Sequence, residues 1–257
     1  MKRWLVLTVG VVSYAIFFAT FLYAIGFMGN FLVPKSIDSG AEGSLWQALL
    51  INGSLLLLFA VQHSVMARPG FKNWWTRFVP EPLERPVYVL ASSVAMILMF
   101  WLWRPMGGTV WHVENTLGIA LLYGVFAAGW LLILVSTFLI NHFDLFGLRQ
   151  VWLYFRGQEY VPLKFAMPWP YRVVRHPLYV GWLTAFWATP TMTMAHLVFA
   201  IATTAYILVA IVFEERDLVD AHGRDYEKYR NTVPMLIPGL KMNSKDRASD
   251  ESSTAAV

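Results

Sequence analysis

The run HPLYVGWLTAFWATPTMTMAHLVFAIATTAYILVAIVF, residues 176–213, contains no Asp, Glu, Lys or Arg. At about 1.5 Å per residue, a single helix of this length would be far longer than the roughly 30 Å hydrocarbon core of a bilayer. Pro190 lies near the middle of the run and is followed by Thr191. Because proline lacks a backbone N–H and breaks helices, the run predicts a helical hairpin. Its short first arm, residues 177–189, would cover roughly 20 Å, so it either tilts or ends inside the protein.

Four other charge-free runs precede this hairpin, at residues 4–28, 45–67, 86–103 and 116–141. Each is long enough to cross a bilayer as a helix, in which the backbone hydrogen bonds are satisfied within the segment. With 57% hydrophobic and only 14% charged residues, the chain has too little polar surface for a soluble protein of this length. We expect an all-α fold, a polytopic transmembrane helix bundle of four long spans plus a C-terminal hairpin.

The chain is expected to form a single integral membrane domain over residues 1–240. The first apolar run is longer than an ordinary signal-peptide core and no small-residue cleavage site follows it, so we expect it to be retained. Residues 241–257, KMNSKDRASDESSTAAV, are polar and mixed in charge, which predicts a disordered cytoplasmic tail.

The positions of Lys and Arg predict the orientation, because basic connecting segments are retained on the cytoplasmic side during insertion. With the N-terminus inside, all of the 20 Lys and Arg residues except Lys35 and Arg104 fall in cytoplasmic segments. An odd number of helices in the last run would place the basic C-terminal segment on the far side of the membrane. The distribution of Lys and Arg therefore also supports the hairpin. Both termini are therefore expected to be cytoplasmic.

Composition and motifs also exclude several classes of function. The net charge of +4 is accounted for by the cytoplasmic segments, so no nucleic-acid partner is needed, and no protein partner is predicted. The absence of Cys excludes disulfides, Cys-ligated metals and a catalytic thiolate of the protein's own. No GxGxxG or Walker sequence indicates a soluble nucleotide-binding fold.

The segment RHPLYVG, residues 175–181, lies where a basic loop enters the short arm. Pro177 suits a first helical turn, which leaves the positive helix end near Arg175 and His176, where a carboxylate can bind. Gly181 permits close approach by a ligand or by another helix, and Tyr179 offers a ring and a hydroxyl. The alternative is that these residues only anchor the helix at the membrane interface.

The pair Glu214 and Glu215 follows the last apolar run directly. Two carboxylates at the membrane boundary can accept strong hydrogen bonds from hydroxyls or from the ammonium group of a polar ligand. The simpler alternative is that charged residues here merely end a transmembrane helix.

Together these segments resemble the signature of the integral membrane methyltransferases, a family that includes isoprenylcysteine carboxyl methyltransferase and phospholipid N-methyltransferases. In that family an RHPxYxG-like segment is followed, one helical hairpin later, by an EE pair, and here GRDYEKYRNTVP follows at residues 223–234. The family binds S-adenosylmethionine, so the resemblance implies this cofactor within about residues 141–238. The residues implied to bind it are Gln150, Arg175, His176, Tyr179, Gly181, Glu214 and Glu215.

Two further stretches, QHSVMAR at residues 62–68 and NHFDLFGLRQ at residues 141–150, resemble a bacterial family of methanethiol S-methyltransferases. This resemblance extends over most of the chain and implies a location in the bacterial inner membrane. The implied substrate is a small volatile thiol, methanethiol, which is methylated to dimethyl sulfide, with hydrogen sulfide as a second acceptor to consider. The alternative within the enzyme class is methylation of a prenylcysteine or a lipid.

A thiol is a poor nucleophile until it loses its proton, so such a site needs a base or a positive field. His142 can accept a proton near neutral pH, with Asp144 to orient it or to bind a neighbouring cation. His63, at the inner end of the second span, is the other candidate base. Each has a structural alternative, because a histidine at a helix end is often solvated or capped, and Asp144 could cap the turn begun at Asn141.

A different class of function is a non-catalytic haem- or metal-binding membrane protein. Four of the six histidines lie toward the inner ends of the spans: His63, His142, His176 and His222. The spans offer no paired histidines at matching depths, which axial haem ligation would require, and no metal site is predicted.

Overall fold

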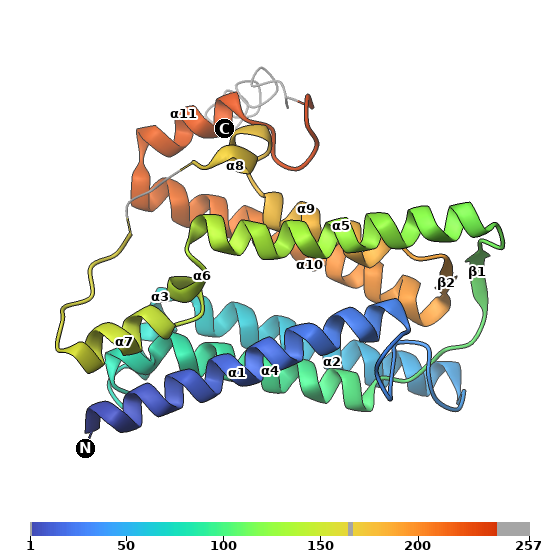
Figure 1. The fold of residues 1–257 in the computed structure, drawn as a ribbon, viewed down its shortest axis with the longest axis horizontal. Coiled ribbons are helices and arrows are strands. Elements are labelled where there is room, and N and C mark those ends of the chain that lie inside the picture. Colours follow the sequence, from blue (N-terminus) through green and yellow to red (C-terminus); the bar gives the residue numbers. More distant parts are fainter. Residues whose placement is uncertain (1, 164–166, 241–257) are drawn as a thin grey trace, which may run out of the picture.

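The computed structural model describes residues 2–163 and 167–240, and within them the apolar runs form long helices that lie side by side (Figure 1). These helices are α1 (Lys2–Gly29), α2 (Leu45–Ala67), α4 (Glu84–Leu102), α5 (Thr116–Ile140) and α10 (Met194–His222). In the described part of the chain these five are long and apolar enough to cross a membrane, α4 together with the preceding turn η1 (Glu81–Leu83). The predicted all-α, polytopic bundle is confirmed. The tail predicted at residues 241–257 lies outside the described residues.

The last apolar run forms the predicted hairpin. Its first arm is α9 (Pro177–Trp187), whose 11 residues extend over only about 16 Å, and its second arm is α10. The connection between them contains a short strand, β2 (Thr191–Thr193), which pairs antiparallel with β1 (Thr109–His112). Sequence analysis did not predict this ribbon. It forms because Pro190 ends the helix and leaves backbone groups unpaired, and the N–H of Val113 donates to the Pro190 carbonyl at 2.9 Å.

The short helices lie toward the end of the bundle that carries the N-terminus, and the β1–β2 ribbon lies at the opposite end (Figure 1). They are α3 (Pro69–Trp75), α6 (His142–Leu145), α7 (Leu148–Arg156), α8 (Trp169–Val173) and α11 (Arg224–Thr232). This arrangement agrees with the charge division, because these short helices and the loops between them hold most of the basic residues.

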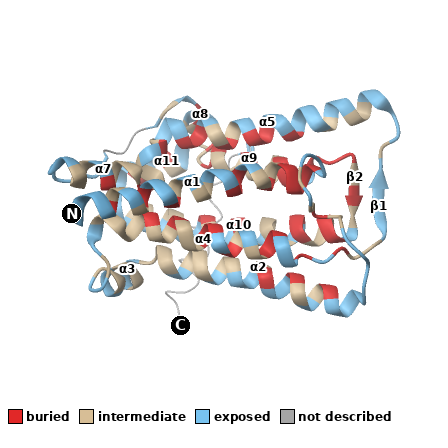
Figure 2. Cartoon of the chain, turned by 60° about the horizontal axis from the view of Figure 1, so that its bottom comes forward, coloured by how far each residue is buried: buried red, intermediate tan, exposed pale blue. Residues whose placement is uncertain are grey.

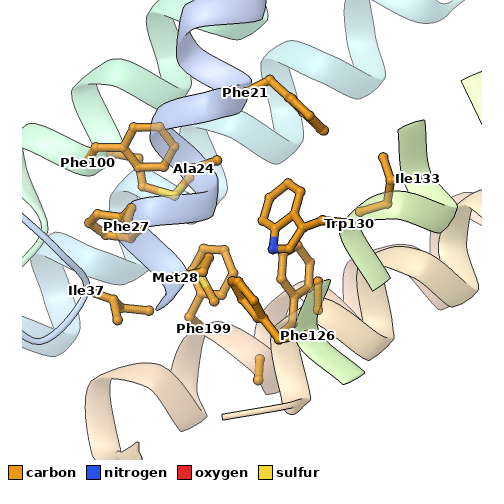
Figure 3. Close-up of a cluster of buried hydrophobic side chains, with 14 of the residues drawn as sticks. Phe21, Ala24, Phe27, Met28, Ile37, Phe100, Phe126, Trp130, Ile133 and Phe199 are labelled. Carbon is orange, nitrogen blue, oxygen red and sulfur yellow. The ribbon is translucent and has the colours of Figure 1, made fainter. Parts of the chain in front are cut away.

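The interior of the bundle is aromatic. Figure 3 shows Phe27 and Met28 of α1 beside Phe126 and Trp130 of α5, with Phe199 of α10 completing the cluster. The outward faces of the long helices are also apolar, but they are exposed (Figure 2), as in Leu50, Leu57, Leu117, Leu121 and Leu131. A soluble monomer rarely exposes so much apolar surface, whereas a hydrocarbon core covers it.

Helices α5 and α9 cross at two glycines and make the closest helix contact in the bundle. A Cβ atom on Gly129 would lie 2.8 Å from the Ala185 backbone nitrogen, and one on Gly181 would lie 2.9 Å from the Gly129 carbonyl oxygen. Both neighbours are backbone atoms, which cannot rotate away. The two glycines therefore allow the short helix α9 to be held deep in the bundle by direct backbone approach.

This crossing predicts that Gly129→Ala destabilises the protein by about 1–3 kcal/mol, because the added methyl group overpacks a backbone contact. The matched control is Gly124→Ala on the same helix, where an added Cβ meets nothing within 4 Å. The control should be neutral or stabilise by up to about 1 kcal/mol, since Ala favours helix over Gly. Thermal unfolding of the two variants in detergent measures the difference, and equal unfolding temperatures would contradict this account of the crossing.

Candidate active site

Arg175, which lies just before α9, ties three segments together. Its Nε donates to Glu215 Oε1 at 2.7 Å and its Nη2 lies 2.7 Å from the same oxygen. Its Nη1 donates to the carbonyl oxygens of Arg230 at 2.9 Å and Val233 at 2.5 Å. Both charged side chains are nearly buried, at 11% and 13% exposure. The guanidinium is thus used to join the start of α9 to α10 and to the end of α11.

His176 completes this joint. Its Nε2 lies 3.1 Å from Glu215 Oε1, and its backbone N–H donates to the Met235 carbonyl at 3.2 Å. Pro177 occupies the first turn of α9, as its sequence position predicts. The structure therefore brings the RHPLYVG segment and the EE pair into direct contact, although they are far apart in the chain.

Glu214 and Glu215 lie inside α10, which continues to His222. The helix therefore extends past the end of the apolar run, and the two carboxylates do not end it. On this helix the two residues have different partners, because Glu215 binds Arg175 and His176 whereas Glu214 accepts a hydrogen bond from the Tyr179 hydroxyl at 2.8 Å. Among the described residues, Tyr179 is the one hydrogen-bond partner of Glu214, so this carboxylate retains capacity to bind a ligand.

Tyr171 of α8 adds a polar group beside Glu214. Its hydroxyl is buried and has no hydrogen-bond partner within the described residues. Burial first, and then the Glu214 carboxylate, raise the pKa of Tyr171, so its hydroxyl stays protonated. A buried hydroxyl without a partner is costly, so this group has unused hydrogen-bonding capacity.

Two of the other predicted cofactor residues lie elsewhere. Gly181 lies at the α5–α9 crossing. Sequence analysis predicted that it permits close approach of a ligand or of another helix, and in the structure the close neighbour is helix α5. Gln150 lies on α7, where its Nε2 donates to the Asp144 carbonyl at 3.0 Å. No contact among the described residues joins Gln150 to Arg175 or Glu214, so the structure does not place it with the signature.

His142 is buried at 3% exposure, and both of its ring nitrogens have partners. The Thr137 hydroxyl donates to the Leu134 carbonyl at 2.7 Å, so its oxygen accepts from His142 Nδ1 at 2.8 Å. Nε2 is then the bare nitrogen, and it accepts from the Tyr14 hydroxyl at 2.8 Å. Burial lowers the pKa of His142, and Phe138 stacks on its ring at 4.3 Å. The alternative of a solvated histidine is wrong.

Asp144 does not orient His142, contrary to the first of its two predicted roles. It binds a cation instead, because Arg149 Nη1 donates to its Oδ1 at 2.8 Å, and Tyr160 donates to Oδ2 at 3.3 Å. The cap of the turn is Asn141, whose side chain accepts from the Asp144 N–H at 3.1 Å. Through these two partners, Asp144 connects α6 to α7 and to the segment after α7.

His63 of α2 lies in a second polar cluster, between α2, α4 and α10. The Tyr88 hydroxyl lies 2.9 Å from its Nε2 and 3.0 Å from its Nδ1, and Ser92 Oγ lies 3.2 Å from Nδ1. The neighbouring Ser64 and Tyr206 hydroxyls are 3.1 Å apart. Tyr88 and Tyr206 both lie within electrostatic reach of Tyr179. Through Tyr206, this cluster is joined to α10, the helix that also carries Glu214 and Glu215.

The polar groups that sequence analysis missed are tyrosines: Tyr14, Tyr88, Tyr171 and Tyr206. Three of them lie inside apolar runs, where a phenol hydroxyl needs a hydrogen-bond partner. This requirement could have identified them from the sequence as residues with a polar contact. It does not name the partner, because each partner lies on another helix.

Comparisons with known proteins place the chain among methyltransferases. It is 60% identical over 244 residues to a methanethiol S-methyltransferase of Crocosphaera subtropica, which covers 95% of the chain and 96% of the relative. It is 53% identical to methanethiol S-methyltransferase 2 of Bradyrhizobium diazoefficiens, over 96% of each protein. Nurim of Mus musculus is more distant, at 32% identity over 69% of the chain and 70% of that protein. No family model and no solved structure matches the chain.

Proposed function

The chain belongs to the methanethiol S-methyltransferase family, and from this premise we propose that it transfers a methyl group to the sulfur of methanethiol, giving dimethyl sulfide. The observation that carries the proposal is identity of 60% across 95% of the chain to a protein of that name. Substitutions at this level of identity are spread over a common fold, so the chemistry of the relatives is the best guide to this chain. The same relatives favour an enzyme over a non-catalytic haem carrier.

A methyltransferase needs a methyl donor, and the chemistry of the site suits S-adenosylmethionine. This donor carries an ammonium group, ribose hydroxyls and a carboxylate, and when bound it supplies an electrophilic methyl group on a sulfonium. Glu214, with one hydrogen-bond partner, and the unpartnered Tyr171 hydroxyl fit such groups. Tyr179 adds an aromatic ring, which can attract a cation.

The role proposed for each signature residue follows from its contacts. Tyr171, Tyr179 and Glu214 would hold the donor directly, because they keep free hydrogen-bonding capacity or an aromatic face. Arg175 and Glu215 would instead position these groups, since they form an ion pair with each other and Arg175 also donates to two backbone carbonyls. His176 shares this positioning role through Glu215.

The proposed location is the bacterial cytoplasmic membrane with both termini inside. The two basic residues assigned to the far side support this, because both lie near the β1–β2 ribbon in the chain. Asp38, three residues after Lys35, accepts a hydrogen bond from Thr193 of β2, and Arg104 lies five residues before β1.

A reporter fused after Leu240 should be cytoplasmic, and one inserted at Ser39 should report the outside. The matched control is a reporter inserted at Arg77, in the first proposed cytoplasmic loop, which should report the cytoplasm. If the reporters at Leu240 and Ser39 lay on the same side of the membrane, the proposed orientation would be contradicted.

The acceptor is tested with purified protein and methyl-labelled S-adenosylmethionine. Methanethiol, hydrogen sulfide, a prenylcysteine and phosphatidylethanolamine are compared as acceptors, and label should appear in dimethyl sulfide. Labelling only of the prenylcysteine or the phospholipid would overturn the proposed substrate. An absorption spectrum with a Soret band would bring back the haem alternative.

Donor binding is tested by replacing Glu214 and Glu215 one at a time. Glu214→Gln should raise the dissociation constant for S-adenosylmethionine roughly 10- to 100-fold, because a hydrogen bond to a charged group contributes about 1.5–3 kcal/mol. Glu215→Gln should also lower the unfolding temperature, since it leaves the Arg175 charge buried without a partner. Calorimetry and thermal unfolding report the two effects.

The matched control is Asp217→Asn, which removes another carboxylate from α10. Asp217 is 56% exposed and pairs with Arg68 at 3.2 Å, so its loss should change neither donor binding nor stability measurably. Unchanged affinity in folded Glu214→Gln, or an equal loss in Asp217→Asn, would remove Glu214 from the donor site.

A further inference from the structure

The described residues include two Tyr–His pairs. Tyr14 lies 2.8 Å from His142 Nε2, and Tyr88 lies 2.9 Å from His63 Nε2. The Tyr14 hydroxyl contacts one ring nitrogen of His142, whereas the Tyr88 hydroxyl also lies 3.0 Å from His63 Nδ1. In both pairs a hydroxyl-bearing side chain lies against the other ring nitrogen, Thr137 in the first and Ser92 in the second. The surroundings of the two pairs differ, and this difference separates their roles.

The proton positions of the Tyr88–His63 pair follow from Ser92. The Ser92 hydroxyl donates its single hydrogen to the Tyr88 carbonyl at 3.0 Å, so its oxygen is an acceptor for His63 Nδ1–H at 3.2 Å. Nε2 is then the basic nitrogen, and it accepts from the Tyr88 hydroxyl. The Tyr88 oxygen keeps lone pairs that no described residue other than His63 contacts.

This pair is joined by side-chain contacts to α10, the helix that carries Glu214. Phe59 stacks on His63 at 5.2 Å and lies 6.3 Å from Tyr206 of α10, whose hydroxyl is 3.1 Å from that of Ser64. Tyr206 lies about 12 Å along the helix from Glu214.

Tyr88 and Tyr206 are within electrostatic reach of Tyr179, which in turn binds Glu214. The remaining charged groups that act on Tyr88 are Arg85 and Glu84, on its own helix. A substrate placed between Tyr88 and Tyr179 would therefore meet the His63 pair on one side and the donor residues on the other.

The Tyr14–His142 pair lies in a different environment. Phe138 stacks on His142, and Phe17 stacks on Phe146 with ring centroids 3.9 Å apart next to the pair. Unlike Tyr88, neither Tyr14 nor His142 is among the groups that act electrostatically on Tyr179. An imidazole enclosed by aromatic rings, with both nitrogens bonded, packs α6 against α1.

We propose that Tyr88 and His63 form a proton relay that deprotonates the acceptor thiol, while Tyr14 and His142 are structural. In this step the thiol S–H proton passes to the Tyr88 oxygen as the Tyr88 proton passes to His63 Nε2. The sulfur lone pair forms the new S–CH₃ bond, and the sulfonium C–S bond breaks with its electron pair remaining on the donor sulfur. His63 later releases the proton to solvent. The inference rests on the proposed thiol methyl transfer.

The test compares the pH dependence of kcat for Tyr88→Phe and for the matched control Tyr14→Phe. Each variant removes one hydroxyl from one Tyr–His pair and keeps the ring. Tyr88→Phe should lose about 100-fold or more near neutral pH, as general-base groups do, with donor affinity unchanged. The loss should shrink as pH rises, because solution then supplies the thiolate. Tyr14→Phe should follow the wild-type profile within about threefold.

Wild-type activity on methanethiol is established first by the acceptor assay, so a failure of the proposed function appears there and not here. The relay is overturned by a Tyr88→Phe profile parallel to the wild type and within about threefold of it, or by a pH-dependent loss in Tyr14→Phe instead. Should Tyr88→Phe fold poorly, Ser92→Ala gives the same readout, because it keeps both relay side chains and removes the acceptor that fixes the His63 tautomer. A wild-type profile in Ser92→Ala and in His63→Gln would also reject the relay.

Discussion

Backbone N–H and C=O groups inside a bilayer have no water to bind, and the architecture of this protein depends on that constraint. Every long apolar run must become a helix, so neighbouring helices are joined by side-chain contacts or by close packing at small residues. Where a run cannot continue, at Pro190, the freed backbone groups pair with a second strand in the β1–β2 ribbon. The ribbon closes the end of the bundle opposite the short helices (Figure 1).

The same constraint makes polar side chains within the spans conspicuous, since each one must find a partner on a neighbouring helix. Tyr179 finds Glu214, Tyr206 finds Ser64, and Tyr88 finds His63. These contacts join α9 to α10, α10 to α2 and α2 to α4. The short helix α9 makes the first of these contacts possible, because it begins at the buried Arg175–Glu215 joint and is held in place by the Gly129 and Gly181 crossing.

Charge is used in two ways at this end of the molecule. The Arg175 guanidinium is enclosed by Glu215 and by backbone carbonyls, so its contribution is to fix the relative positions of three segments. Glu214, one residue earlier on α10, faces Tyr179 and keeps an oxygen available. Adjacent residues on a helix point about 100° apart, which is why an EE pair can combine a positioning role with a binding role.

The sequence alone determined the four long spans before the last apolar run, the hairpin within that run and the pairing of RHPLYVG with Glu214 and Glu215. Apolar length, a helix-breaking proline and a family signature are properties of local sequence. The sequence could not decide between His142 and His63, and it left two roles open for Asp144, of which the structure shows cation binding, to Arg149. Only the tertiary structure showed that His142 is enclosed by aromatic rings and that His63 of α2 is bound by Tyr88 of α4. The physical reason is that a side chain's partner depends on how its helix is rotated and which helix packs against it, and that rotation is set by packing across the whole bundle.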